Sequence, residues 1–211
     1  MEKRMNDSKQ GGAPSSTNEV NLDILDLCSS WISHLPSSGV SYGRVVGIGL
    51  NEKELRENVQ LTEYHVQNLN KNPLLTELFE DNSFDVICNV VSVDYLTQPL
   101  PVFQEMYRIL RPNGIALVSF SNRCFPTKAI SIWLREDDIG RLSIVASYFH
   151  YAATWNVIEA YDIKPRTETP PRPSIKEIMA EPSRGLAWIN AAAAISKINA
   201  GDPMYVVKAV K

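Results

Sequence analysis

Hydrophobic and polar positions along the chain alternate between two periodicities. Short, mostly apolar runs indicate buried strands, and stretches with apolar residues three or four apart indicate helices. The run 84–93, "FDVICNVVSV", is apolar almost throughout, which is typical of a central parallel strand buried on both faces. In all, the pattern predicts strands at 22–27, 44–50, 63–69, 84–93, 115–121, 155–163 and 204–210.

Helix signals lie between several of these strands. Asn51 with Glu54 three residues later has the form of a capping box, in which the Asn accepts from an early helix N–H and the Glu reaches back. This pair predicts a helix through about residue 59. Two further helical stretches are expected at about 126–135 and 137–152.

The clearest helix follows Pro99 and Pro101, which suit a helix entrance. Pro112 and the pair Asn113-Gly114 are expected to stop it. Between these signals, one apolar stripe runs at helical spacing through Val102, Phe103, Met106, Tyr107 and Leu110.

Alternating strands and helices predict an α/β fold with a parallel sheet and right-handed crossovers. Such sheets bind ligands beyond the carboxyl ends of their strands, where the strand order reverses. The site candidates are therefore the residues that follow each strand. They fall in segments 26–31, 49–51, 68–70, 89–95 and 121–125.

The chain is expected to form one domain, 21–211, after a disordered polar leader, 1–20. Residues 164–200 read as an insertion between the last two strands: a proline-rich part, "KPRTETPPRPS", precedes an Ala-rich part that favours a helix. No function is assigned to this insertion. With no signal-peptide pattern and no apolar run of about 20 residues, a cytoplasmic protein without a membrane partner is expected.

Composition narrows the chemistry. The chain is 44% hydrophobic and 21% charged with a net charge of −3, so no nucleic-acid partner is expected. Its three cysteines and three histidines are scattered without metal-ligand spacing, which argues against a metal site. The odd cysteine count is consistent with a reducing compartment.

The stretch "FEDNSFDVICNVVSVDYLTQPLPVFQEMYRILRPNGIALVSFSNR" resembles class I S-adenosylmethionine-dependent methyltransferases, the type 11 branch most closely. The likeness is specific over 80–121 and extends weakly from 22 to 163. It implies a Rossmann-like three-layer sandwich with a mostly parallel seven-stranded sheet and an antiparallel last strand. It also implies S-adenosylmethionine as cofactor and a small-molecule methyl acceptor.

The resemblance places the cofactor near the turn after the first strand, where the family has an acid and a glycine-rich loop. Asp26 matches the acid, but Cys28, Ser29 and Ser30 occupy the loop. Small residues still permit a close approach, although Ser29 or Ser30 can equally cap a short helix. Trp31 fits only if its indole points into the core.

After the second strand the family has an acid that binds both ribose hydroxyls. Gly49 stands there instead, followed by Leu50 and Asn51, of which Asn51 is the weaker neutral substitute. Losing a charge-assisted pair of hydrogen bonds costs about 1.5–3 kcal/mol of binding. Reduced cofactor affinity is the expected consequence.

The remaining implied cofactor contacts follow strands three and four. Asn68 with Leu69 lies where the family binds adenine, but an Asn at this point also suits a turn that bonds its own backbone. The segment after strand four lines the adenine or methionine region in the family, and plain strand core is the alternative for it here. Its residues are Asn89, Val90 and Val91.

Candidate catalytic residues follow strands four and five. Asp94 and Tyr95 lie where a substrate could bind, with Tyr95 equally suited to packing. Asn122 and Arg123 follow the fifth strand, and Arg123 can clamp a carboxylate or phosphate or remain a surface residue. No general base is obligatory, because positioning an activated sulfonium beside a nucleophile can suffice.

Family members usually carry helices before the first strand that cover the cofactor, so the chain is expected to be a shortened form with an open site. The Ala-rich insertion or a protein partner would then supply the cover. The alternative function is a catalytically inactive binding or interaction protein. A nicotinamide-dependent oxidoreductase is disfavoured, because no G-x-G-x-x-G follows a strand.

Overall fold

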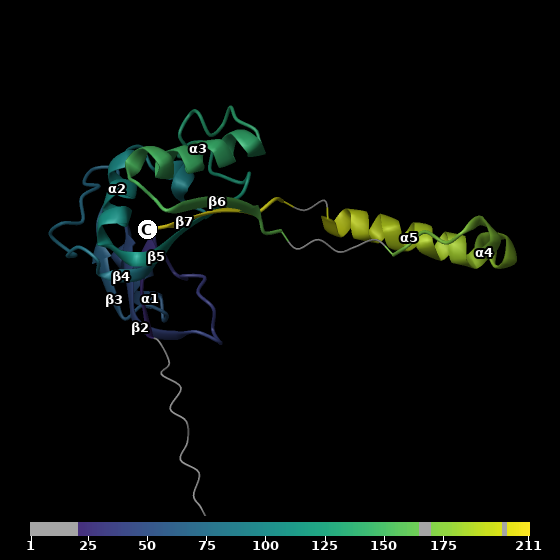
Figure 1. The fold of residues 1–211 in the computed structure, drawn as a ribbon, viewed down its shortest axis with the longest axis horizontal. Coiled ribbons are helices and arrows are strands. Elements are labelled where there is room, and N and C mark those ends of the chain that lie inside the picture. Colours follow the sequence, from purple (N-terminus) through teal and green to yellow (C-terminus); the bar gives the residue numbers. More distant parts are fainter. Residues whose placement is uncertain (1–20, 165–169, 200–201) are drawn as a thin grey trace, which may run out of the picture.

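The computed structural model describes residues 21–164, 170–199 and 202–211, and it contains one seven-stranded sheet (Figure 1). The strand order is β3-β2-β1-β4-β5-β7-β6. Only β7 runs antiparallel to its neighbours, which confirms the predicted Rossmann-like class and the antiparallel last strand. The strands are β1 (Asn21–Leu27), β2 (Ser41–Gly49), β3 (Glu63–Val66), β4 (Phe84–Val90), β5 (Leu110–Phe120), β6 (Val157–Asp162) and β7 (Tyr205–Val210).

Helices α2 and α3 lie together over one side of the sheet (Figure 1). Three residues of the predicted apolar stripe are buried on α2, while Tyr107 is partly exposed and Leu110 belongs to β5. Phe103 of this stripe meets Phe149 of α3 edge to face with the ring centroids 4.7 Å apart. Such aromatic pairs lock two helices in one register. The helical elements are α1 (Glu52–Glu57), the 3₁₀ turn η1 (Val93–Tyr95), α2 (Pro99–Ile109), α3 (Asp138–Ala152), α4 (Ile175–Ala180) and α5 (Pro182–Asn199).

The helix predicted at 126–135 is wrong, because this segment forms successive turns instead. The backbone N–H of Ile130 donates to the carbonyl of Asp94 at 2.9 Å, which takes it out of a helical ladder. Trp133 is then fully buried, with its ring 5.1 Å from that of Phe120. Tertiary contacts with η1 and with the end of β5 thus replace the local helix.

Several predicted boundaries also move. β4 ends at Val90 instead of residue 93, because Val91 has a positive φ of 45° and η1 begins at Val93. The third strand ends at Val66 instead of residue 69. α2 ends at Ile109, before the predicted stop at 112–114, and those residues belong to the irregular start of β5.

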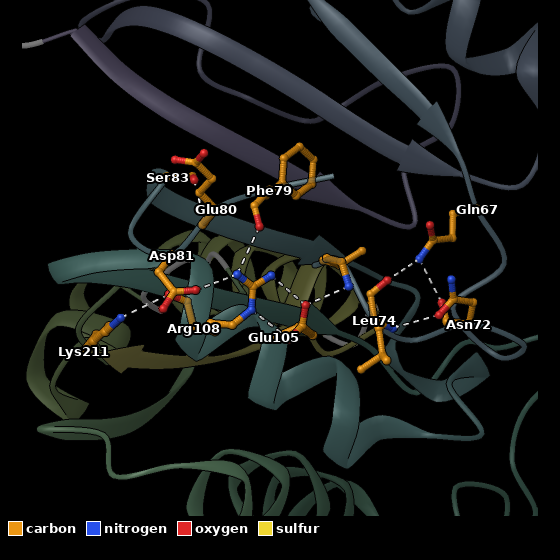
Figure 2. Close-up of polar contacts among 11 residues, drawn as sticks. Gln67, Asn72, Leu74, Phe79, Glu80, Asp81, Ser83, Glu105, Arg108 and Lys211 are labelled. Atoms are coloured by element: carbon orange, nitrogen blue, oxygen red, sulfur yellow. Dashed lines mark hydrogen bonds and ion pairs between the residues drawn. The ribbon is translucent and has the colours of Figure 1, made fainter. Parts of the chain in front are cut away.

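A largely buried ion pair within α2, between Glu105 and Arg108, is bonded to the loop before β4 (Figure 2). Glu105 accepts from the backbone N–H of Leu75 at 2.7 Å and from two nitrogens of Arg108 at 2.8 and 2.9 Å. Arg108 also donates to the carbonyl of Phe79 at 3.0 Å and to Asp81 at 2.7 Å. Burial raises the pKa of Glu105, but the Arg108 guanidinium and the Leu75 N–H outweigh it and hold that pKa below its usual value. These two residues of the family-like stretch therefore have a structural role.

The insertion forms a helical hairpin, α4–α5, that extends away from the sheet (Figure 1). Its Ala-rich helix is confirmed as α5. Local contacts hold it: the Trp188 indole donates to the carbonyl of Pro170 at 2.8 Å, and a capping box joins Ser174 to Glu177. The expected leader, 1–20, lies outside the described residues. No helix in the part of the chain that the structure describes has the length and hydropathy to span a bilayer.

Candidate cofactor site

A pocket of about 310 Å³ opens at the carboxyl ends of the parallel strands, the edge that the sequence predicted. Its wall comes from the segments after β1, β2 and β3, from η1 and from the loop after β5. Nine of the predicted site residues line it: Cys28, Ser29, Ser30, Gly49, Leu50, Asn51, Asn68, Leu69 and Tyr95.

The turn after β1 takes the place of a glycine-rich loop. Cys28 has a φ of 61°, the left-handed conformation that glycine adopts most easily. Asp26 lies behind the turn, fully buried, where it accepts from the Ser29 hydroxyl at 2.6 Å. Burial raises the pKa of Asp26. Asp26 does not line the pocket, so its role in the structure is to hold the turn through Ser29.

The two sulfhydryl groups nearest this turn are unreactive by their surroundings. Burial raises the pKa of the Cys28 thiol to about 12, and the Cys88 thiol points at the Asp26 carboxylate with a sulfur–oxygen distance of 3.7 Å. A thiol with such a pKa supplies almost no thiolate at neutral pH. Cys28 therefore offers shape and not nucleophilic chemistry.

Trp31 neither fills the pocket nor points into the core. Its side chain is 55% exposed and is not among the pocket-lining residues. The expectation from the sequence, that Trp31 fits only with its indole in the core, is therefore wrong. The space above the Ser29–Ser30 turn stays open.

The end of β2 explains why no acid stands at position 49. The backbone of the β1 turn crosses it closely, with the Ser29 N–H donating to the Ile48 carbonyl at 2.8 Å. A Cβ atom added to Gly49 would lie 2.3 Å from the Ser29 carbonyl oxygen, closer than real contacts permit. The position therefore accommodates only glycine.

Glu54 brings a carboxylate into the pocket from the first turn of α1. It accepts from the Ser30 hydroxyl at 2.5 Å and from the Asn51 amide at 2.8 Å. Asn51 caps α1 as predicted, accepting from the Lys53 N–H at 3.1 Å. The expected return contact from Glu54 is different, since it reaches the Asn51 side chain instead of the backbone.

The loop after β3 forms the next part of the wall. Asn68 accepts from the Asn70 N–H at 3.0 Å, the local turn that the sequence left as one alternative. The Asn70 amide donates to the Tyr95 carbonyl at 2.8 Å and accepts from the Thr97 N–H at 2.8 Å. This side chain therefore ties the loop to η1 and fixes the width of the pocket.

The last two residues of β4 and Val91 after them lie outside the pocket lining. Asn89 is buried and donates to the Leu27 carbonyl at 3.1 Å, which joins β4 to β1. Val90 and Val91 are not among the lining residues. Since the left-handed region is costly for a β-branched residue, Val91 marks the sharp exit from β4 that leads to η1.

The four catalytic candidates from the sequence do not lie together in the pocket. Asp94 is buried, one of its carboxylate oxygens has no hydrogen-bond partner among the described residues, and burial raises its pKa to about 6. Tyr95 lines the pocket, and its hydroxyl accepts from the Phe125 N–H at 3.1 Å. Asn122 and Arg123 are exposed and lie outside the pocket lining, and Arg123 pairs with Asp202 at 2.5 Å.

Sequence reasoning missed Lys128, the one lysine of the pocket wall as described. Its ammonium lies 5.3 Å from the Phe125 ring centroid, on the turn-rich segment that the sequence predicted as helix. No local pattern marks it, because only the tertiary path of this segment brings it to the pocket. Glu54 was visible in the sequence as a capping partner alone. Gln67, Asn70, Ser92, Leu96 and Ile48 complete the lining.

Among the described residues, no three His, Cys, Asp or Glu side chains gather in a group that could hold a metal ion. The pocket's polar groups are hydroxyls, amides, one carboxylate and one ammonium. Such groups suit an organic ligand with hydroxyl and charged parts.

Residues 28–118 match the family model described as a methyltransferase domain. The Bacillus subtilis (strain 168) protein described as uncharacterized methyltransferase YbaJ is 30% identical over 106 residues, covering 48% of this chain and 41% of that protein. The chain thus spans less than half the length of this curated relative.

Solved structures agree with the fold. A Mesorhizobium loti S-adenosylmethionine-dependent methyltransferase superposes with a TM-score of 0.52 at 16% identity, covering 92% of each chain. A methyltransferase in complex with the Haloferax volcanii Trm112 activator superposes with a TM-score of 0.53 at 17% identity, covering 91% of this chain and 83% of that one. Residues 28–118 are thus similar to the methyltransferase domain family, and the chain has the fold of solved S-adenosylmethionine-dependent methyltransferases.

Proposed function

We propose that the chain binds S-adenosylmethionine in this pocket and transfers its methyl group to a small-molecule acceptor. The observation that supports this best is the pocket itself. It lies at the carboxyl edge, its floor is the left-handed Cys28 turn, and Trp31 leaves it clear. Its volume is at the lower end of the roughly 300–1,000 Å³ typical of ligand sites.

Glu54 is the residue that we propose for the ribose hydroxyls. A carboxylate accepts two O–H bonds at once, and each Glu54 oxygen keeps acceptor capacity beyond its one contact in the structure. Since Gly49 has no room for a side chain, the first turn of α1 is the nearest source of such an acid. Lys128 offers a positive charge for the carboxylate of the methionyl part.

When bound, the cofactor supplies an activated methyl group on a sulfonium. The protein then acts mainly by holding acceptor and sulfonium in line and by excluding water. Tyr95 and Ser92, on the η1 side of the pocket, are placed to contact the acceptor. Asp94, next to Tyr95, stays a proposed proton acceptor on condition that the methyl acceptor reaches it, since it is buried and outside the pocket lining.

Arg123 stays a proposed clamp for an anionic acceptor, on condition that it leaves Asp202. A protein partner that covers the open pocket is also proposed, in line with the neighbour solved together with its activator. Three free cysteines fit a reducing compartment, so we propose the cytoplasm.

The test has two stages with the full chain. S-adenosylhomocysteine should raise the melting temperature, and labelled S-adenosylmethionine should then transfer its methyl group to a member of a small-molecule panel. Glu52→Gln, in the same helical turn but outside the pocket lining, is the matched control for Glu54→Gln. No thermal shift at millimolar ligand would refute the proposal. A shift without transfer to any acceptor would leave an inactive binding protein.

A further inference from the structure

Exposed apolar side chains lie at the edge of the sheet that holds the pocket, and one of them, Leu50, lines it. They follow four of the parallel strands, and their exposed fractions run from 41% for Val91 to 69% for Leu50. Large apolar groups gathered at one edge of a protein mark a surface that is covered in some state. We call this set the apolar rim: Trp31, Ile32, Leu50, Val91 and Phe125.

The α4–α5 hairpin also carries exposed apolar side chains. Ile175 and Met179, one turn apart on α4, are 77% and 79% exposed. Leu186 and Ile189, three residues apart on α5, are 61% and 57% exposed. Residues at these spacings share one face of a helix. Isolated helices of this length are marginal in water, so these two gain stability from a surface that buries the exposed side chains.

The topology puts the hairpin and the rim at the same edge. β6 enters the insertion at Asp162 and β7 leaves it at Tyr205, and these two residues are register partners. Tyr205 in turn pairs with Phe120, at the carboxyl end of β5. The Arg123–Asp202 ion pair fixes the start of the return segment beside the loop after β5. Both connections of the hairpin therefore arise beside the pocket.

The dimensions also match. α5 has 18 residues, which at 1.5 Å per residue is about 27 Å. From β7 to β3 the sheet order gives five inter-strand steps of about 4.8 Å each, or about 24 Å. A helix anchored next to β7 is thus long enough to lie across every strand end that lines the pocket.

We propose that the α4–α5 hairpin docks on the apolar rim and covers the pocket, as an alternative to the extended arrangement in Figure 1. The occupant of the rim is then this chain's own insertion. The exposed side chains of both surfaces would be buried against each other, and the pocket would lose its contact with bulk water. Such a cover strengthens every polar contact inside the site.

Cross-linking tests the docking without using the proposed activity. Leu50→Cys combined with Leu186→Cys places one thiol on the rim and one on the hairpin. Val40→Cys combined with Leu186→Cys is the matched control, because Val40 is 39% exposed directly before β2, at the amino edge of the sheet opposite the rim. Each pair is compared with its single variants, since Cys28, Cys88 and Cys124 remain in the chain.

A short bismaleimide should join the rim pair within one chain several-fold more efficiently than the control pair. Equal yields for the two pairs, or links between chains only, would overturn the proposal, and the latter would point to a second copy on the rim. A second readout rests on the proposed function. Leu186→Asp with Ile189→Asp should weaken S-adenosylhomocysteine binding about tenfold, and Val40→Asp should leave it unchanged. Unchanged affinity in the hairpin variant would contradict the cover, whereas absent binding in the wild type would contradict the proposed function alone.

Discussion

For Gly49, at the end of β2, the family pattern and the structure lead to opposite predictions. From the family pattern alone, Gly49→Asp restores a missing ribose ligand and should tighten cofactor binding about ten- to a hundredfold. In the structure, a Cβ atom there lies 2.3 Å from the Ser29 carbonyl and 3.0 Å from a Leu55 methyl carbon. We therefore expect Gly49→Asp to bring no gain in cofactor affinity and a loss of stability.

The size of the loss follows from the atoms involved. The Ser29 carbonyl belongs to backbone that also donates to Ile48, so it cannot move without breaking that hydrogen bond. Overpacking of this kind costs about 1–3 kcal/mol. In a domain of this size that lowers the melting temperature by about 3–10 °C. Gly49→Ala, which adds only the methyl group, should carry most of the effect.

Gly47→Ala is the matched control, because Gly47 lies two residues before Gly49 on the same strand. Its Cβ would lie 2.5 Å from a Leu61 methyl carbon, the far end of a side chain that can rotate. We expect a smaller loss of melting temperature for Gly47→Ala than for Gly49→Ala in differential scanning fluorimetry. A Gly49→Asp protein with unchanged melting temperature and tighter S-adenosylhomocysteine binding would refute the geometric argument.

Three further predictions concern carboxylates. Glu54→Gln should weaken S-adenosylhomocysteine binding about tenfold in calorimetry, because a charged acceptor is lost, whereas an unchanged affinity, equal to that of Glu52→Gln, would contradict its role. Glu105→Gln should lower the free energy of unfolding by about 2 kcal/mol in urea titrations at pH 7, since Arg108 loses one charged partner but keeps Asp81; a loss below about 1 kcal/mol would show that the pair contributes no more than an exposed ion pair does. Asp94 has a folded pKa raised to about 6, so the unfolded state ionises first and stability falls as pH rises from about 4 to 6. Asp94→Asn should therefore raise the melting temperature at pH 7.5 but not at pH 4, and an equal change at both would exclude this titration.

The sequence predicted those elements whose signal is local. β4 and α2 were found because a long apolar run and a proline-led apolar stripe identify a buried strand and an amphipathic helix. The edge that holds the pocket followed from alternation alone. In contrast, residues 126–135 were predicted as helix, because the contact of Ile130 with Asp94 that unwinds them joins two distant segments.

The polar groups of the pocket were predicted less completely for the same reason. Asn51 and Asn68 were found because each lies near the end of a predicted strand, where the family resemblance implies cofactor contacts. Glu54 was seen only as a capping residue, since its reach into the pocket depends on the Ser30 hydroxyl meeting it from another strand end. Lys128 depends on a path that no periodicity describes. Sequence thus located the edge, and packing decided which side chains face the ligand.

Calorimetric titration of the full chain with S-adenosylhomocysteine tests the central claim most directly. The account predicts saturable binding of one ligand per chain, weakened by Glu54→Gln and unaffected by Glu52→Gln. Absence of binding heat up to millimolar ligand, or binding that both variants leave unchanged, would contradict it.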